Sequence, residues 1–471
     1  MKRQMTCWLI LGLVAWAWGI SGSANALEKG APPNVVIIFC DDLGYGDIEP
    51  FGAKQIKTPH LAQMASEGRK FTNFYVPQAV CSASRTGLLT GCYPNRVGIY
   101  GALGPNSKTG ISDKEQTLAE LLHDANYRTA IFGKWHLGDK PQFLPTKHGF
   151  DQYYGLPYSN DMWPKHPTAK FPDLPLIEND KVIQIDPDQR LLTAEYTRRA
   201  VEFVSKKSDQ PFFLYLPHTM PHVPLFVPDD RKGRSAAGLY GDVIEHIDWS
   251  VGQVLQAIKD VGKEESTIVI FTSDNGPWLS YGNHAGSSGG LREGKGTSFD
   301  GGVRVPFIVR WPKTIAPGTV CDQPLMTIDL LPTLVGITGA QMPKLPIDGK
   351  ENKDLLLGKS EAKNDQRPYW FYWGKELHAV RKGKWKLHLA HPYIHLQEPG
   401  KDGQPGKLPT QKLEQALFDL ESDPAESKDV AATHPEVLTD LLAEVEKARA
   451  DLGDSLVGRE GNAKRPSGVV E

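Results

Sequence analysis

Continuous apolar runs, rich in β-branched and aromatic residues, recur along the first two thirds of the chain. Such runs are typical of strands covered on both faces, and they occupy residues 34–39, 129–132, 212–216, 267–272 and 305–310. Apolar residues at helical spacing lie between them, in 58–68, 114–125 and 243–258. We expect the first of these helices to start with a Thr58 cap. Strands alternating with helices predict an α/β domain built on a large, mostly parallel mixed β-sheet flanked by helices.

The pattern changes near residue 365. Three short aromatic and alternating runs, at 369–373, 377–381 and 384–388, predict a small antiparallel sheet. A capping box from Thr433 to Glu436 predicts the start of a last helix. We therefore expect a large main domain over 27–364, a smaller C-terminal α+β subdomain over 365–458, and a flexible tail over 459–471.

Residues 1–26 have the features of a signal peptide. Lys2 and Arg3 precede an apolar run over 7–20, and Ala24-Asn25-Ala26 is a small-x-small cleavage site. The run is too short for a good membrane span, and no other stretch qualifies. The sequence thus predicts export, to the periplasm or outside the cell. Without this segment 51 Lys and Arg face 56 Asp and Glu, a net charge near −5, which favours neither nucleic acid nor an anionic membrane as a partner.

Carboxylates directly follow two of the predicted strands. Asp41 and Asp42 end the first strand, and Asp274 and Asn275 end the strand over 267–272. Ligand sites in open α/β sheets lie at the carboxyl ends of strands, and acids gathered there would repel each other without a cation between them. Because all donors are oxygens, Ca²⁺ is favoured over Mg²⁺. Taken alone, either pair could have no more than a structural role, as turn or cap residues.

Lysine and histidine residues gather at the same predicted edge. Lys134 and His136 follow the strand over 129–132, His222 stands between prolines after the strand over 212–216, and Lys295 lies in a glycine-rich run over 294–306. Ammonium and imidazole groups suit the binding of a tetrahedral anion and proton transfer. Each of these residues alone could simply be solvated.

The run Cys81-Ser82-Ala83-Ser84-Arg85 opens a predicted helix, where backbone N–H groups favour an anionic group. A lone cysteine is more often just buried. The run resembles the signature of the type I sulfatases of the alkaline phosphatase superfamily. The resemblance, to the arylsulfatase branch in particular, covers almost the whole mature chain, and the motifs occur in family order.

The resemblance implies a set of functional residues. In that family the signature cysteine, here Cys81, is converted to formylglycine, whose hydrate is the nucleophile. The implied calcium ligands are Asp41, Asp42, Cys81, Asp274 and Asn275. Arg85 and Lys134 would steady the hydrate, His136 would act as a base, and Lys295 and His222 would grip sulfate and protonate the leaving alcohol. Ser159 would hydrogen-bond sulfate.

One residue departs from the commonest form of the signature: Ala83 replaces proline. The resemblance implies a formylglycine-generating maturation enzyme as a partner, and such enzymes differ in accepting alanine here. The departure bears on which enzyme modifies Cys81 and leaves the site assignment unchanged.

Two alternatives to a sulfatase remain open from the sequence. One is a phosphodiesterase or phosphonate hydrolase of the same superfamily, and the other is a non-catalytic binder of sulfated glycans with an unmodified Cys81. For a sulfatase we expect a sulfated carbohydrate substrate, with aryl sulfates also accepted. The pocket rim should come from 99–112, 157–190 and the C-terminal strands, including Trp163, Lys165, His166, Trp373, His378 and Arg381.

Overall fold

Strand β1, Asn34–Cys40, lies at the centre of the large sheet, and all seven of its residues are buried. It pairs in parallel with β8 (Phe212–Pro217) on one side and β9 (Thr267–Ser273) on the other. β4 (Arg128–Phe132) and β5 (Gln152–Gly155) extend the parallel part beyond β8. The computed structural model describes residues 31–359, 362–364 and 366–470, so the predicted signal peptide lies outside the described residues.

The edges of this sheet are mixed. β10 (Arg304–Arg310) runs antiparallel to β9 and to β2 (Arg69–Tyr75), on which β11 (Thr319–Cys321) and β12 (Leu325–Met326) pair. At the far edge β6 (Pro175–Glu178) and β7 (Lys181–Ile185) are antiparallel. The predicted class, a large and mostly parallel mixed sheet flanked by helices, is confirmed.

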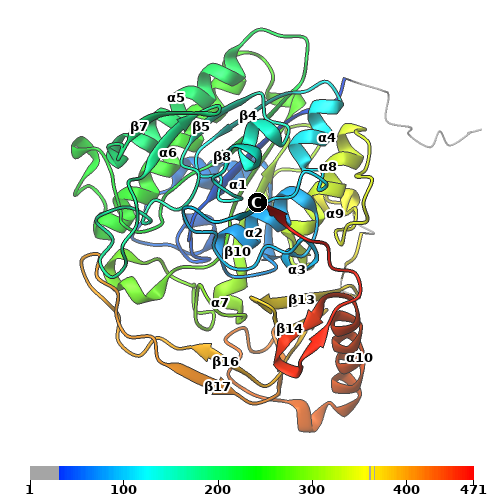
Figure 1. The fold of residues 1–471 in the computed structure, drawn as a ribbon. Helices are drawn as coiled ribbons and strands as arrows, with labels where there is room; N and C mark the ends of the chain where they lie inside the picture. The colour runs from blue at the N-terminus through cyan, green and yellow to red at the C-terminus, as the bar shows by residue number, and fades with distance from the viewer. Residues whose placement is uncertain (1–30, 360–361, 365, 471) are drawn as a thin grey trace, which may run out of the picture. The chain divides into compact units, whose positions relative to one another are not determined.

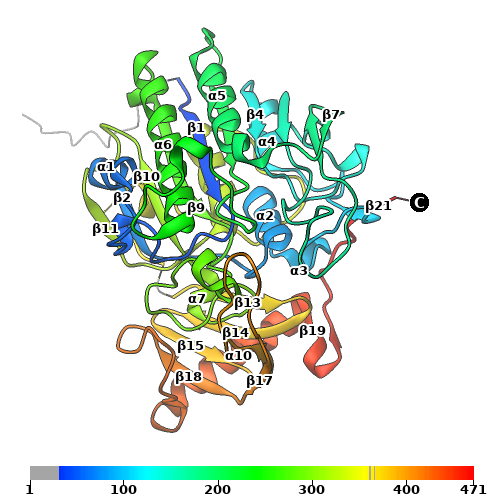
Figure 2. The same ribbon diagram turned by 90° about the vertical axis from the view of Figure 1, so that its left-hand side faces the viewer.

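Helices cover both faces of the sheet (Figures 1 and 2). Alternate residues of β1 point to opposite cores, because side chains alternate along a strand. Val36 and Ile38 pack with residues of α1 (Pro59–Glu67), α5 (Leu192–Ser205) and α6 (Gly238–Asp260). Val35 and Ile37 share the other core with α2 (Cys81–Thr90), α4 (Leu118–Asp124) and α8 (Leu330–Thr338). The remaining short helices are α3 (Pro94–Val97), α7 (Asp300–Val303) and α9 (Lys353–Leu357).

Two helix starts differ from the sequence pattern. The Thr58 side chain does not cap α1; the Asp248 carboxylate of α6 does, accepting from the backbone N–H groups of His60 at 3.2 Å and Leu61 at 2.8 Å. α4 begins four residues later than predicted, at a capping box that the prediction missed: Thr117 Oγ1 accepts from Glu120 N at 3.1 Å, and Glu120 accepts from Thr117 N at 2.7 Å.

The C-terminal part holds a four-stranded antiparallel sheet, covered by α10 (Pro435–Leu452). Its strands are β13 (Pro368–Trp373), β14 (Glu376–Lys382), β15 (Trp385–His388) and β18 (Ala416–Asp419). A hairpin of β16 (His391–Ile394) and β17 (Thr410–Leu413) stands beside it. The predicted capping box of α10 is wrong: the N-cap is His434, it makes no side-chain cap, and Pro435 opens the helix.

The segment predicted as a flexible tail is paired instead. β20 (Arg459–Glu460) pairs with β19 (Gly453–Asp454), and β21 (Gly468–Val469) pairs with β3 (Thr109–Gly110). In Figure 2 the red C-terminal segment accordingly leaves the small sheet and runs up the side of the molecule to β21. The described residues from Pro32 onward form one compact unit, and the domain boundary near residue 365 stays a prediction. Among the helices in the described part of the chain, none has the length and apolar character needed to cross a membrane.

Candidate active site

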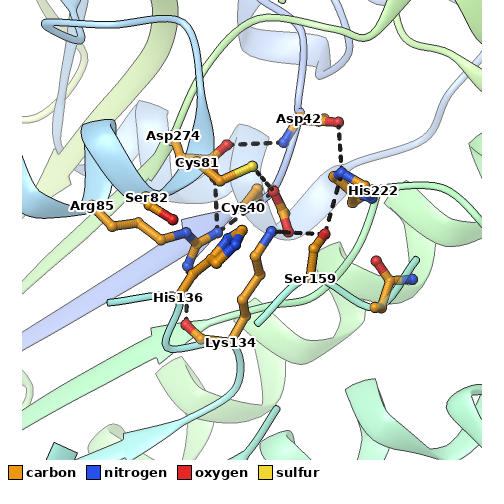
Figure 3. A network of polar contacts seen from close by, with 12 residues as sticks. Cys40, Asp42, Cys81, Ser82, Arg85, Lys134, His136, Ser159, His222 and Asp274 are labelled. Carbon is orange, nitrogen blue, oxygen red and sulfur yellow. Dashed lines mark hydrogen bonds and ion pairs between the residues drawn. The ribbon is translucent and has the colours of Figure 1, made fainter. Parts of the chain in front are cut away.

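The ends of β1 and β9 bring the predicted carboxylates together. Cys40 and Ser273 are partners in the parallel register, so Asp41 and Asp274 leave the sheet side by side. Asp274 N donates to Cys40 O at 3.1 Å, and Asp42 N donates to Asp274 Oδ1 at 3.0 Å. All three carboxylates are buried. Figure 3 shows Asp42 and Asp274 beside Cys81.

Cys81 is the first residue of α2 and points at these carboxylates. Its Sγ lies 3.4 Å from Asp41 Oδ1 and 3.6 Å from Lys295 Nζ. Cys81 is only 2% exposed. Burial raises the pKa of the Cys81 thiol, so the side chain is a neutral thiol at neutral pH. Because the thiolate is the nucleophile, the unmodified cysteine is poorly suited to attack.

Three cations balance the three carboxylates. Arg85 Nη2 donates to Asp274 Oδ2 at 2.8 Å, and Arg85 Nη1 donates to the carbonyl oxygen of Lys134 at 3.0 Å. Lys134 Nζ lies 2.5 Å from Asp41 Oδ2, and Lys295 Nζ lies 2.7 Å from Asp42 Oδ1. A further divalent cation would give the site two net positive charges, which suits an anionic substrate.

His136 is held in one tautomer. Its Nε2 lies 2.9 Å from the carbonyl oxygen of Leu103, which can only accept, so Nε2 carries the proton. Nδ1 is buried and has no hydrogen-bond partner among the described residues. Burial, with the charges of Lys134 and Arg85, holds the pKa of His136 well below its usual value. His136 therefore offers a neutral nitrogen with a free lone pair.

His222 faces the site through its other nitrogen. Its Nδ1 donates to the Val223 carbonyl oxygen at 2.6 Å. Its Nε2 lies 3.4 Å from Ser159 Oγ and 3.6 Å from Asp42 Oδ2. Ser159 Oγ also accepts from Lys134 Nζ at 3.1 Å, so the predicted serine joins the network. Burial is the main cause that lowers the pKa of His222, and the charge of Lys295 lowers it further.

The site residues fit a hard divalent cation. Ligand atoms of Asp41, Asp42, Cys81 and His222 all lie within 4.8 Å of one another. Burial and the neighbouring Asp41 raise the pKa of Asp274 to about 7, a strain on its ionised form that a cation would relieve. Asn275 Oδ1 is buried with no hydrogen-bond partner among the described residues, and an amide oxygen is a ligand of such ions.

The structure also differs from the expected ligand set. Asp274 accepts from Arg85 through one oxygen and from Asp42 N through the other, so its oxygens lie outside the tight group. His222, which we expected to grip sulfate and protonate the leaving alcohol rather than to ligate a metal, lies inside it. The remaining residues of the expected set, Asp41, Asp42 and Cys81, are in the group, and Asn275 Nδ2 donates to Asp42 Oδ1 at 2.7 Å.

Part of the expected rim lies next to the site. Trp163 and Lys165 line a pocket of about 260 Å³ with Val223, Tyr281 and His284. His378 and Arg381 were expected at the rim, and this is wrong. Both side chains are buried: the His378 ring stacks on His391 at 3.8 Å, and the Arg381 guanidinium lies 4.6 Å from the Tyr75 ring.

Two contacts of the site were missed from the sequence. Leu103 acts through its carbonyl oxygen, and a backbone contact leaves no trace in residue type. Trp278 lies under Lys295, with Nζ 4.4 Å from the ring centroid, and 5.4 Å from the His222 ring. Its position three residues after Asn275, at a strand end with site residues, could have indicated it.

Comparison with known proteins identifies the family of this chain. The profile of the sulfatase family matches residues 33–340. The chain belongs to the sulfatase family. A profile for the C-terminal region of aryl-sulfatase matches 364–469, and one for the C-terminal part of N-sulphoglucosamine sulphohydrolase matches 294–391. The predicted family is thus confirmed, and this sulfatase is a sulfuric ester hydrolase.

Similar proteins cover most of the sulfatase. Bovine arylsulfatase A is 38% identical over 459 residues, covering 90% of this chain and 88% of its own length. N-acetylgalactosamine-6-sulfatase of the dog is 37% identical over 405 residues, covering 82% and 76%. The crystal structure of PsFucS1 sulfatase from Pseudoalteromonas sp. has a TM-score of 0.78 and 26% identity, covering 89% and 91%.

Proposed function

We propose that this sulfatase removes sulfate from a sulfated carbohydrate, and also from aryl sulfates, by means of a formylglycine made from Cys81 and one bound divalent cation. Ca²⁺ is the first choice and Mg²⁺ the second, because the donors are mostly oxygens. The observation that carries the proposal is the place of Cys81. It lies at the start of α2, within reach of Asp41 and Lys295, yet its raised pKa makes the plain thiol a poor nucleophile.

Formylglycine and a divalent cation would supply a nucleophile and a positive charge that the unmodified side chains do not provide. Hydrated formylglycine at position 81 would supply a nucleophilic oxygen, and a divalent cation held by Asp41, Asp42, Asp274 and Asn275 would offset the charge gathered there. His222 Nε2, which lies in the same tight group of ligand atoms, stays available for proton transfer in this assignment. Formation of formylglycine implies a maturation enzyme as a partner.

The cationic side chains bind and orient the sulfate. Lys295 Nζ lies 3.6 Å from Cys81 Sγ, so it can contact a group bound at position 81 and the sulfate oxygens beside it. Lys134 donates to both Asp41 and Ser159, which places its charge between the carboxylates and the serine hydroxyl. Arg85 holds Asp274 and the Lys134 backbone in place. These fixed charges stabilise negative charge that develops on the sulfate oxygens.

The two histidines divide the proton transfers. His222 Nε2 faces Ser159 and Asp42. In the doubly protonated ring, with Nδ1–H on the Val223 carbonyl oxygen, Nε2 also carries a proton and can give it to the departing alcohol. His136 Nδ1 has a free lone pair and can accept a proton from a hydroxyl group at position 81. The two imidazoles are set up differently, since one presents Nε2 and the other Nδ1 to the site.

The pocket beside His222 supports a carbohydrate substrate. It adjoins His222 through Val223 and Pro224, so the alcohol side of a substrate would extend into it. An aromatic ring, Trp163, and polar groups such as Lys165 and His284 line it, a combination that suits a sugar ring. One similar protein, N-acetylgalactosamine-6-sulfatase, is named for a sulfated sugar. The predicted signal peptide supports a reaction in the periplasm or outside the cell.

Mass spectrometry of the tryptic peptide Phe71–Arg85 tests the nucleophile. The protein is made in its own host or together with a maturation enzyme, and the Cys81→Ser variant serves as the control. We expect an aldehyde in place of the Cys81 thiol, with loss of sulfate release in the variant. An unmodified thiol in natively made, active protein would remove the formylglycine from the proposal.

A substrate panel tests the rest. Sulfated monosaccharides and oligosaccharides are compared with 4-nitrophenyl sulfate, a phosphodiester and a phosphonate ester, with released sulfate measured directly. We expect turnover of sulfated sugars and of the aryl sulfate. Turnover of the aryl sulfate alone would contradict a carbohydrate substrate and leave the sulfatase chemistry intact.

A further inference from the structure

We propose that the C-terminal segment 461–470 is a positioning element of the active site, anchored by Arg465. It holds the segment 99–112 in place, and through it the imidazole of His136. The inference rests on the proposed role of His136. Figures 1 and 2 both show the red terminal segment leaving the small sheet and running to the part of the molecule that contains α2 and α3.

Arg465 anchors the segment at a buried carboxylate. Its Nε donates to Glu115 Oε1 at 2.6 Å and its Nη2 to Glu115 Oε2 at 2.8 Å, a two-point contact. Nη1 donates to the Pro346 carbonyl oxygen at 2.9 Å, and the Arg465 backbone N donates to Arg96 O at 2.5 Å. Glu115 is 3% exposed, so the carboxylate end of this ion pair is buried, while the Arg465 side chain is partly exposed.

Beyond Arg465 the segment becomes a strand. Gly468 pairs with Gly110 and Val469 with Thr109, and Val470 N donates to Lys108 O at 2.9 Å. Both glycines pack on the ring of Phe143: a Cβ at Gly468 would lie 2.6 Å from that ring, and one at Gly110 would lie 2.4 Å from it. The close fit leaves no room for a larger residue and fixes how the segment lies against β3.

The other side of β3 is bonded to the loop that carries Lys134 and His136. Ile111 N donates to Leu137 O at 2.9 Å. Trp135 Nε1 donates at 2.7 Å to the carbonyl oxygen of Phe143, the residue on which the two glycines pack. Leu103, in the same 99–112 segment, accepts from His136 Nε2. The C-terminal strand β21 thus contacts the segment 99–112, and Leu103 of that segment contacts the imidazole of His136.

The segment 99–112 is also tied to the signature helix. Leu103 N donates to Ser82 Oγ at 2.9 Å, and Ala83 N donates to Gly101 O at 3.2 Å. Thus one segment contacts the helix that begins at Cys81 and, through Leu103, the ring of His136. A shift of this segment would move His136 relative to position 81, and displacements of this kind are costly for catalysis.

Hydrogen exchange and kinetics of three variants, each compared with the unaltered protein, test the proposal. One variant ends after Asn462, and the second is Arg465→Ala. The third is the double variant Glu115→Gln/Arg465→Gln, which leaves no unpaired buried carboxylate. Lys464→Ala is the matched control, because the Lys464 ammonium pairs with the exposed Glu460 and the residue sits next to Arg465.

In all three variants we expect faster amide exchange in peptides covering 99–112 and 134–138. We also expect kcat on 4-nitrophenyl sulfate, measured per formylglycine and well below the melting temperature, to fall about tenfold or more, with KM changed far less. The control should match the wild type. An unchanged kcat in all three variants, with faster exchange confined to 461–470 in the two that keep this segment, would overturn the proposal. The exchange readout needs no activity, so failure of the sulfatase mechanism would be seen separately.

Discussion

Arg85 Nη2 lies 2.8 Å from Asp274 Oδ2, and both side chains are fully buried. The contact joins α2, which begins at Cys81, to the end of β9. Arg85 also donates to the Lys134 backbone, so one guanidinium links the three chain segments that build the site. The site is thus assembled by a buried ion pair as well as by the sheet.

Replacing Arg85 by methionine should therefore affect stability and activity together. Asp274 would be left buried without its partner, which costs about 3 kcal/mol or more. We expect a lower urea midpoint and no measurable sulfate release. Arg190→Ala, at an exposed pair with Asp188, should leave the midpoint unchanged. A wild-type midpoint in Arg85→Met would contradict the stabilising role.

Metal removal should destabilise the enzyme. Asp41, Asp42 and Asp274 are buried together, and a bound ion at about 100 times its dissociation constant adds about 2.7 kcal/mol to the free energy of unfolding. We expect EDTA to lower the melting temperature and abolish activity, and Ca²⁺ to restore both better than Mg²⁺. Asp42→Asn should blunt the response. Equal stability and activity with and without EDTA would argue against a metal.

The parts of the site that follow strands could be predicted from the sequence. Apolar runs mark β1 and β9, and the parallel register then brings the residues after them together, as with Asp41 and Asp274. Lys134 and His222 follow β4 and β8 in the same way. The reason is general: the carboxyl ends of parallel strands meet at one edge of the sheet.

Contacts between distant segments could not be predicted in this way. Asp248 caps α1 from 188 residues away, in place of the local Thr58. β21 is two residues long, too short for any periodicity, and its pairing with β3 is visible only in three dimensions. His378 looked like a surface group by type, yet it is buried against His391. Polar residues in short strands do not reveal which side of the strand is covered.

Ala83→Pro should change maturation more than fold. Ala83 is the third residue of α2, where the backbone N–H has no partner within the helix, so proline is tolerated. The substitution removes one contact, from Ala83 N to Gly101 O at 3.2 Å. We expect a similar melting temperature and a larger formylglycine fraction in a host whose maturation enzyme prefers proline. Both are measured on the same preparation, and Ala79→Pro is the control outside the signature. An unchanged fraction would show that Ala83 does not limit conversion.

Acid should destabilise the C-terminal part of the protein through the buried histidines of its sheet and of the β16–β17 hairpin. Burial lowers the pKa of His391 to about 4, and its ring stacks on His378 at 3.8 Å and on His388 at 5.5 Å. Because the unfolded value is about 6.5, the unfolded state takes up the proton first as the pH falls. The neutral, buried His391 therefore adds its full share to the free energy of unfolding above about pH 6.5. This share, about 3 kcal/mol, is lost as the pH falls toward 4.

Urea midpoints at pH 7.5 and pH 5 measure this effect. The wild type should lose stability over that interval, and His391→Gln should lose less of it, although it starts lower because its contact to the Leu389 carbonyl changes. His123→Gln, at a half-exposed histidine, should follow the wild type. An equal pH dependence in His391→Gln and the wild type would contradict the assignment.

Replacing Lys165 should weaken the binding of sulfated sugars without affecting small aryl sulfates. It lines the pocket beside His222, and its Nζ lies 5.1 Å from the Trp163 ring centroid, so charge and aromatic surface are offered together. A sulfated oligosaccharide reaches this pocket, whereas 4-nitrophenyl sulfate is too short. Loss of a charge-assisted contact should raise KM for the oligosaccharide about tenfold in Lys165→Ala and leave the aryl sulfate kinetics unchanged. Lys170→Ala, exposed in the same loop, should match the wild type with both substrates. Equal effects of Lys165→Ala on both substrates would place its role at the sulfate itself, and no effect on either would remove this pocket from sugar binding.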